Sequence, residues 1–161
     1  IADASNNIGV AYKNQKKYNE ALQYLQESLT SYQIIGRKKG IAAALNNIAS
    51  VYKETEKYQQ ALEYFNNALI IAKDIKVRDL QIEIYENISD IYAVKKDYKT
   101  SLQYYKLYSN IKDSTFTKER MEIISGMETT YEVELLLEEQ EKEIVLLQKD
   151  NEIYKLNLLI L

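Results

Sequence analysis

Histidine, cysteine and proline are absent from the 161 residues, and glycine occurs four times. Without cysteine the chain has no disulfide and no thiolate metal site, which leaves its redox compartment open. Without histidine it lacks the usual general base at neutral pH, the commonest metal ligand and any phosphohistidine chemistry. Gly9, Gly36, Gly40 and Gly126 stand singly, so no glycine-rich loop can hold a phosphate. We therefore predict no catalytic residues, no metal site and no cofactor in this segment.

The charge balance excludes another class of partner. The net charge is -3, whereas a nucleic-acid-binding face needs concentrated basic charge, so we expect no nucleic acid here. A composition rich in Leu, Ile, Ala, Lys, Glu and Gln, without proline, favours helices joined by short connections. Because the chain starts in phase with its own repeat, we expect a fragment of a longer protein. It ends in "LNLLIL", an apolar run far shorter than the roughly 20 residues that span a bilayer.

One pattern occurs three times at a spacing of about 40 residues: "NNIGVAYKNQKKYNEAL", "NNIASVYKETEKYQQAL" and "ENISDIYAVKKDYKTSL". Apolar residues recur at helical spacing on both sides of a polar stretch, which predicts a helix, a turn and a second helix in each repeat. We interpret the tyrosines as packing framework and the turn lysines as aids to solubility. The alignment superposes the presumed core isoleucines Ile8, Ile48 and Ile88, and the tyrosine sets Tyr12, Tyr52 and Tyr92, Tyr18, Tyr58 and Tyr98, and Tyr24, Tyr64 and Tyr104.

Small residues stand where two helices must come closest: Gly9, Ala49, Ser89, Ala21, Ala61, Ser101, Ser28 and Ala68. This pattern resembles the tetratricopeptide repeat, whose signature spacing Ala49, Ala61 and Ala68 match fully. The third repeat departs from it at Tyr108, which we expect to pack differently, and the family's terminal proline is missing. The resemblance implies an all-α superhelix of three hairpins over residues 1–36, 37–76 and 77–113, followed by a long helix over 114–161 that is a candidate coiled coil.

Asparagine precedes the central isoleucine of every repeat, at Asn7, Asn47 and Asn87. Asparagine is a mediocre helix former, so its presence at three equivalent positions calls for a reason. In tetratricopeptide arrays the first helices line a concave groove, and in long-repeat members asparagines at this position contact bound peptide, which is what the resemblance implies here. Alternatively, each amide bonds within the scaffold to the neighbouring repeat. Both interpretations stay open.

Further side chains share this helix phase and are candidates for the same peptide-binding face: Lys13, Lys53, Glu83, Glu86 and Asp90. Such a groove would run from mildly basic to acidic and would orient a charged peptide. The alternative is an ordinary solvated helix face. Asn6 and Asn46 are weaker candidates, because Glu86 stands at their position in the third repeat.

After "KDSTFT", which offers Asp113, Ser114 or Thr115 as a helix cap, the repeat ends and a helix-compatible run of about 45 residues follows. A heptad frame through its second half predicts a homodimeric coiled coil, with Asn151 as the polar residue that fixes register. Alternatively, the first half packs back on the third hairpin through residues such as Met121 and Tyr131. The predicted dimerisation seam is Val133, Leu137, Ile144, Leu147, Asn151, Tyr154 and Leu158.

The tail also resembles the segment that follows the repeats in bacterial membrane-anchored tetratricopeptide sensor histidine kinases and related helix-turn-helix regulators, through "KDS", "YEVE" and "QKDNEIYKL". This resemblance implies a non-catalytic sensor module that binds a protein or peptide, dimerises through its last helix and signals toward a membrane segment beyond Leu161. It implies an extracytoplasmic, periplasmic location for the module, with a cytoplasmic location as the alternative. The rival functions are a soluble adaptor or assembly scaffold and, ranked last, a carboxylate enzyme.

Overall fold

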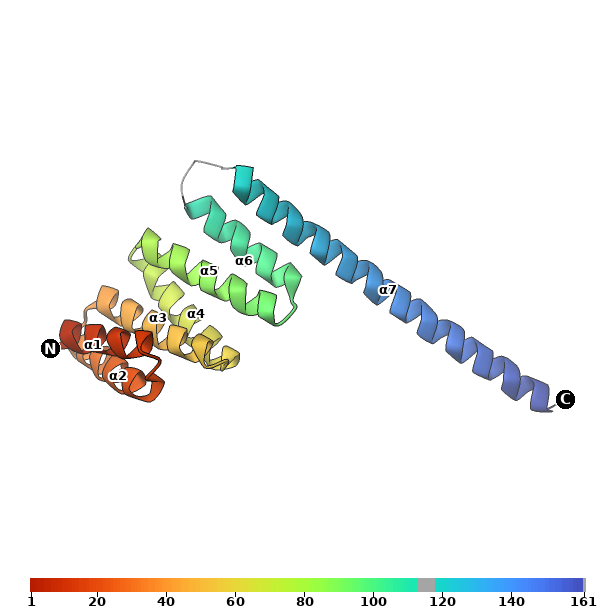
Figure 1. The fold of residues 1–161 in the computed structure, drawn as a ribbon, viewed down its shortest axis with the longest axis horizontal. Coiled ribbons are helices and arrows are strands. Elements are labelled where there is room, and N and C mark those ends of the chain that lie inside the picture. Colours follow the sequence, from red (N-terminus) through yellow and green to blue (C-terminus); the bar gives the residue numbers. More distant parts are fainter. Residues whose placement is uncertain (113–117, 161) are drawn as a thin grey trace. The chain divides into compact units, whose positions relative to one another are not determined.

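The computed structural model describes residues 1–112 and 118–160, with side-chain surroundings throughout except at 118–120, 151 and 154–160. The described residues form seven α-helices and no strand, which confirms the predicted all-α fold of three helical hairpins and a long final helix. Figure 1 shows the hairpins as the pairs α1 and α2, α3 and α4, and α5 and α6. The helices are α1 (Ala2–Asn14), α2 (Tyr18–Ile34), α3 (Lys38–Glu54), α4 (Tyr58–Asp74), α5 (Arg78–Val94), α6 (Tyr98–Ile111) and α7 (Lys118–Ile160).

Every connection from α1 to α6 is a turn of three residues with one geometry. In the first turn the N–H of Lys17 donates to the carbonyl of Tyr12 at 2.9 Å, and the N–H of Lys16 donates to that of Lys13 at 2.8 Å. This pairing is the Schellman motif, which needs a left-handed residue. A non-glycine residue adopts that conformation at a cost of roughly 1–2 kcal/mol. The left-handed residues are Lys16, Gly36, Glu56, Lys76 and Lys96.

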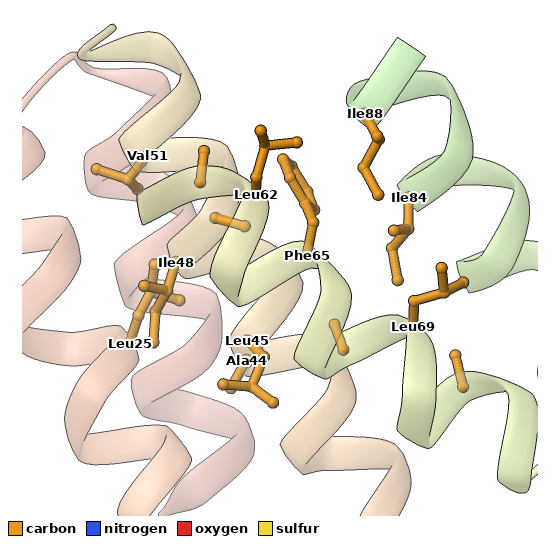
Figure 2. Close-up of a cluster of buried hydrophobic side chains, with 14 of the residues drawn as sticks. Leu25, Ala44, Leu45, Ile48, Val51, Leu62, Phe65, Leu69, Ile84 and Ile88 are labelled. Carbon is orange, nitrogen blue, oxygen red and sulfur yellow. The ribbon is translucent and has the colours of Figure 1, made fainter. Parts of the chain in front are cut away.

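The core between repeats is built by isoleucines that pack on the preceding hairpin. Ile48 on α3 lies beside Leu25 of α2, and Ile88 on α5 lies on the side of α4 that carries Phe65 (Figure 2). Their exposed fractions are 1% and 0%. The prediction that Ile8 belongs to the core is wrong, since Ile8 is 41% exposed. The reason is positional, because none of the described helices covers that side of α1.

Small residues occupy the closest approaches within each hairpin, as the pattern predicts. A Cβ atom on Gly9 would lie 2.6 Å from Cγ of Leu25, so α1 and α2 are too close there for a side chain. In the third hairpin Ser89 and Ser101 each donate a hydrogen bond to the other's backbone carbonyl at 2.9 Å, which joins α5 to α6. The whole set is buried: Gly9, Ala21, Ser28, Ala49, Ala61, Ala68, Ser89 and Ser101.

Tyr108 fills the position of the last small residue in the third hairpin, and its packing there is aromatic. The side chain is 6% exposed, and its ring lies 5.4 Å from that of Tyr105 at an angle of 49°. The Lys112 ammonium donates to the Tyr108 hydroxyl. The large ring therefore reaches a polar partner at the end of α6, as buried tyrosines usually do.

A stack of two tyrosines and one lysine recurs in every hairpin. The Tyr12 and Tyr24 rings lie 5.4 Å apart, and the Lys17 ammonium lies 5.7 Å from the centroid of Tyr12. The tyrosines are therefore framework, as predicted. Three of the turn lysines that the sequence assigned to solubility also cover an aromatic face, while their side chains stay exposed. The corresponding stacks are Tyr52, Tyr64 and Lys57, with 5.4 Å between rings, and Tyr92 and Tyr104, with 5.9 Å, on which Lys95 stacks from two positions earlier in the turn because Asp97 stands at the position of Lys17.

The final helix α7 is continuous over 43 residues. At 1.5 Å per residue it is about 65 Å long, far longer than any repeat helix. The chain divides into two compact units, residues 1–116 and 117–161, each of which is described by itself. The predicted cap residues Asp113, Ser114 and Thr115 lie outside the described residues.

Candidate functional site

The first helices of the three hairpins form one continuous face. The backbones of α1 and α3 are in contact, as are those of α3 and α5, whereas those of the second helices α2, α4 and α6 do not touch one another. A stack that is tighter on one side curves toward that side. The face of α1, α3 and α5 is therefore the concave face, and the face of α2, α4 and α6 is convex.

Amides join α1 to α3 on the concave face. The Asn47 side-chain amide donates to the side-chain oxygen of Asn6 at 3.0 Å. Asn7, the equivalent of Asn47 in the first repeat, is exposed and makes no hydrogen bond through its side chain to the described residues. One predicted asparagine is thus held by the scaffold, and another presents its amide to solvent.

A lysine joins α3 to α5 further along the same face. The Lys53 ammonium donates to the Asn87 side-chain oxygen at 2.9 Å and to the Asp90 carboxylate at 2.6 Å. Asn87 in turn donates to the backbone carbonyl of Glu83 at 2.9 Å. The structure thus brings together three of the eight predicted side chains, Lys53, Asn87 and Asp90, in one network between repeats, and Glu83 joins it through its backbone carbonyl. Because Lys53 is 24% exposed and Asp90 is 57% exposed, this ion pair is only partly screened by water.

Asn46, which the sequence ranked below Asn47, is the more deeply buried of the two. It is 2% exposed, and its amide donates to the Glu83 carboxylate at 2.8 Å. Its side-chain oxygen is buried and has no hydrogen-bond partner among the described residues. An unpaired buried acceptor costs about 1–3 kcal/mol. Asn46 is therefore part of the scaffold. The repeat alignment could not predict its hydrogen bond to Glu83, because the alignment places Glu86, and not Glu83, at the position equivalent to Asn46.

The remaining candidates stand apart from this network. Lys13 is half-buried on α1 and forms no ion pair with a described carboxylate. Glu86 is exposed on α5. Because Asp90 neutralises Lys53 within the scaffold, the cationic part of the face reduces to Lys13, while Glu83 and Glu86 keep the α5 end acidic.

A cluster that the sequence did not reveal ties the first hairpin together. The Tyr32 hydroxyl donates to the Asp3 carboxylate at 2.6 Å, and the Arg37 guanidinium donates to the same carboxylate at 2.8 Å. The hydrogen bonds from Tyr32 and Arg37 hold the pKa of Asp3 below its ordinary value. Burial, together with the neighbouring carboxylate, raises the pKa of Tyr32. The cluster is specific to this hairpin, since Ala43 and Glu83 occupy the position of Asp3 in the other repeats.

The predicted dimerisation residues on α7 stay predictions, and the structure describes the surroundings of four of them. Val133, Leu137, Ile144 and Leu147 are 50%, 55%, 53% and 61% exposed. Neighbouring apolar residues outside the heptad seam, such as Leu146 at 61%, are as exposed. The side chains of Asn151, Tyr154 and Leu158 lie outside the described part.

The described residues contain neither a candidate membrane span nor a candidate metal site. No helix among them combines the length and apolarity that a bilayer crossing requires. Nor do their carboxylates gather in any group of three that would suit a metal ion. The described chemistry of the concave face consists of amides, carboxylates and lysines.

The helical hairpins define a class of repeat protein, and comparison with protein families identifies it. The tetratricopeptide repeat model matches residues 1–74 and again residues 40–114. The chain belongs to the tetratricopeptide repeat family. The search of curated proteins found no match.

Solved structures share the fold at low sequence identity. PilF of Pseudomonas aeruginosa is 22% identical, with a TM-score of 0.59 over 85% of this chain and 60% of its own. The apo form of RapI is 22% identical, with a TM-score of 0.69 over 84% of this chain and 52% of its own. The N-terminal domain of stress-induced protein-1 from C. elegans is 15% identical, with a TM-score of 0.63 over 79% of this chain and 94% of its own. The chain thus spans little more than half the length of PilF and RapI.

Proposed function

We propose that the concave face of α1, α3 and α5 binds an extended segment of a protein partner. The observation that carries this proposal is the exposed Asn7 amide, which has no hydrogen-bond partner among the described residues, whereas Asn47 bonds to Asn6 and Asn87 bonds to Lys53 of the neighbouring repeat. An amide offers a donor and an acceptor, the pair that a peptide backbone requires. Lys13 at the α1 end and Glu86 at the α5 end add charges of opposite sign, which would orient the bound segment.

Binding would compete with the bonds between repeats. A peptide that takes the N–H that Asn47 gives to Asn6, or the donors that Lys53 gives to Asn87 and Asp90, would displace those bonds. Because these bonds join neighbouring repeats, their exchange would change the curvature of the stack. This coupling supports a sensor role, in which occupancy of the groove shifts an equilibrium between two hairpin packings.

The test uses short peptides selected from a displayed library on the immobilised full chain. Asn7→Ala should leave the thermal melting temperature unchanged, because the side chain is exposed, and should weaken a selected peptide about 2- to 10-fold through one lost hydrogen bond. Asn67→Ala on α4 is the matched control, since Asn67 is also exposed but lies on the convex side. Peptides that bind both variants as tightly as the parent chain would refute the concave site.

The same experiment separates the two roles of the bridging asparagines. If Asn47 and Asn87 contact peptide, replacing both with alanine weakens binding at nearly constant melting temperature. A large fall in melting temperature would show instead that they act as scaffold, as their hydrogen bonds to Asn6 and to the Glu83 carbonyl favour.

We further propose that α7 pairs with α7 of a second copy. Its half-exposed Val133, Leu137, Ile144 and Leu147 support this, since coiled-coil seams bury such residues between helices. Sedimentation equilibrium should show a dimer that Leu137→Glu abolishes. Leu146→Glu is the matched control, because Leu146 is equally exposed but off the seam. A monomer at all concentrations, or equal effects of the two variants, would contradict the coiled coil.

At the level of the parent protein, we propose a bacterial sensor histidine kinase or related regulator, with this module on the extracytoplasmic side. The likeness of the tail, "KDS" through "QKDNEIYKL", supports it. The sequence that follows Leu161 in the parent gene tests it. A run of roughly 20 apolar residues leading to an output domain would support the sensor, and a polar terminus would favour the soluble adaptor instead.

A further inference from the structure

A cleft opens on the convex side, where α4 and α6 splay apart over α5. Its volume is about 470 Å³, within the range of clefts that hold a small ligand or several side chains. Its floor is formed by Leu69 and Tyr85, which are 6% and 3% exposed. Its two rims carry Ile70 from α4 and Leu107 from α6, which are 67% and 42% exposed. The cleft therefore presents apolar side chains to solvent on both sides of an apolar floor.

The equivalent surface between the first and second hairpins, called the preceding interface below, shows that repeat geometry does not require apolar rims. At the offset of 40 residues, the positions of Ile70 and Leu107 are occupied by Thr30 and Asn67. The same two rims are thus polar between the first and second hairpins and apolar between the second and third. Exposed apolar residues that form one contiguous surface, as on these facing rims and the floor between them, mark interaction sites.

The cleft also carries a positive charge. Lys73 is the only charged side chain among the described residues that line it, and its ammonium lies 5.5 Å from the centroid of the Tyr85 ring. It forms no ion pair with a described carboxylate. Gln33 occupies its position in the preceding interface, so the cation is as specific to this cleft as the apolar rims are. A ligand that fits both features carries apolar side chains next to a carboxylate.

The walls of the cleft favour a helical ligand over an extended one. They are helices, whose backbone N–H and C=O groups are already paired within each helix. An extended peptide would find amide partners only at Asn66 and Gln103, and its other backbone groups would lie unpaired against apolar side chains such as Leu69 and Ile70. A helix pairs its backbone internally and presents apolar anchors at spacings of three and four residues.

We propose that this convex cleft docks an amphipathic helix of a protein partner. Leucine-type anchors of that helix lie between Ile70 and Leu107, over Leu69 and Tyr85, and a carboxylate beside the anchors pairs with Lys73. This surface lies on the opposite side of the repeats from the concave face, so the chain can engage two partners, or two segments of one partner, at the same time.

The test uses three synthetic helical peptides and the full chain labelled at Ile and Leu methyl groups. The first peptide carries leucines on one face flanked by glutamates, the second replaces the glutamates with lysines, and the third replaces the leucines with alanines. The first should shift the methyl resonances of Leu69, Ile70 and Leu107. The second and third should bind at least about tenfold more weakly, since each loses one part of the recognition.

A triple variant, Ile70→Thr, Lys73→Gln and Leu107→Asn, gives this cleft the residues found between the first and second hairpins. These positions lie at the rim, so circular dichroism should show an unchanged fold, and affinity for the first peptide should fall at least about tenfold. Lys73→Gln alone should remove most of the preference for glutamate over lysine peptides.

The proposal would be overturned if no methyl resonance shifted at peptide concentrations up to about 1 mM, or if the triple variant bound the first peptide as tightly as the parent chain. Methyl shifts that depend on chain concentration in the absence of peptide would overturn it by showing that a second copy occupies the cleft. Cleft methyl groups shielded from solvent in the dilute chain alone would overturn it by showing that the chain fills the cleft itself.

Discussion

Replacing Gly40 with alanine tests how closely α2 and α3 pack. A Cβ atom on Gly40 would lie 2.3 Å from Cδ1 of Tyr32, whereas two carbons in contact lie about 3.5–4.0 Å apart. The Tyr32 ring is 3% exposed and its hydroxyl is bonded to Asp3, so it cannot move aside without breaking that bond. Overpacking costs about 1–3 kcal/mol, offset by about 0.5–1 kcal/mol for removing glycine from a helix. Because the overlap is large, we expect a net loss of about 2 kcal/mol in the free energy of unfolding.

The interface between α4 and α5 suggests a second variant, Tyr32→Ala, in which the same replacement of Gly40 can be tested. At the offset of 40 residues, Tyr32 and Gly40 correspond to Ala72 and Leu80, so the large residue has moved from the second helix to the following first helix. In a Tyr32→Ala background, Gly40→Ala should therefore be neutral or stabilising. Gly40→Leu should recover part of the stability that Tyr32→Ala removes, because it restores one large residue to the interface.

Urea denaturation of the full chain, followed by circular dichroism, measures all of these variants. The difference between the Gly40→Ala effects in the two backgrounds is the coupling between positions 32 and 40, expected at about 2 kcal/mol. An equal loss in both backgrounds would refute the clash with Tyr32. A loss below about 0.5 kcal/mol in the parent chain would show that α2 and α3 separate without strain.

Three further predictions concern a turn and two pH limits. Gly36→Ala should lower the free energy of unfolding by about 1 kcal/mol, because φ is +66° and nothing lies within 4 Å of a Cβ there, and an unchanged urea midpoint would contradict this. The bond from Tyr32 lowers the pKa of Asp3, so Asp3 contributes stability above the ordinary aspartate pKa of about 3.9 that disappears as pH falls through the folded value. Asp3→Asn should therefore lower the urea midpoint at pH 7, and this loss should shrink as the pH falls below about 4; an equal loss at every pH would refute the pairing. Burial raises the pKa of Tyr64 and Tyr104, so stability present below about pH 10 should be lost above it, and ultraviolet titration should show these phenols ionising later than free tyrosine.

Much of the fold follows from local chemistry. The period of about 40 residues, the helical spacing of apolar residues and the small residues at Ala49, Ala61 and Ala68 together predict hairpins that stack. These patterns involve residues within one or two helical turns, or within one hairpin, so they can be recognised in the sequence alone. The turn position was equally clear from "KETEK", although its Schellman geometry was not, because Glu56 is not a residue that usually marks a left-handed turn.

Contacts between repeats carried much weaker signals. The pairings of Asn47 with Asn6 and of Asn46 with Glu83 join residues about 40 positions apart that no alignment column connects. The exposure of Ile8 follows from what lies beside α1, and not from the residue itself. The close fit of the large Tyr32 ring against the small Gly40 likewise becomes apparent only when α2 and α3 are packed together.

The sequence by itself therefore determined the class of fold, the number of hairpins and the residues that pack within each, because helical periodicity and side-chain size are local properties. The tertiary structure alone decided which asparagines are occupied by the scaffold and which is left free, and where the convex side opens. The physical reason is the stacking of hairpins. The tighter side brings polar side chains from different repeats into hydrogen-bond distance, and the wider side leaves a cleft between α4 and α6.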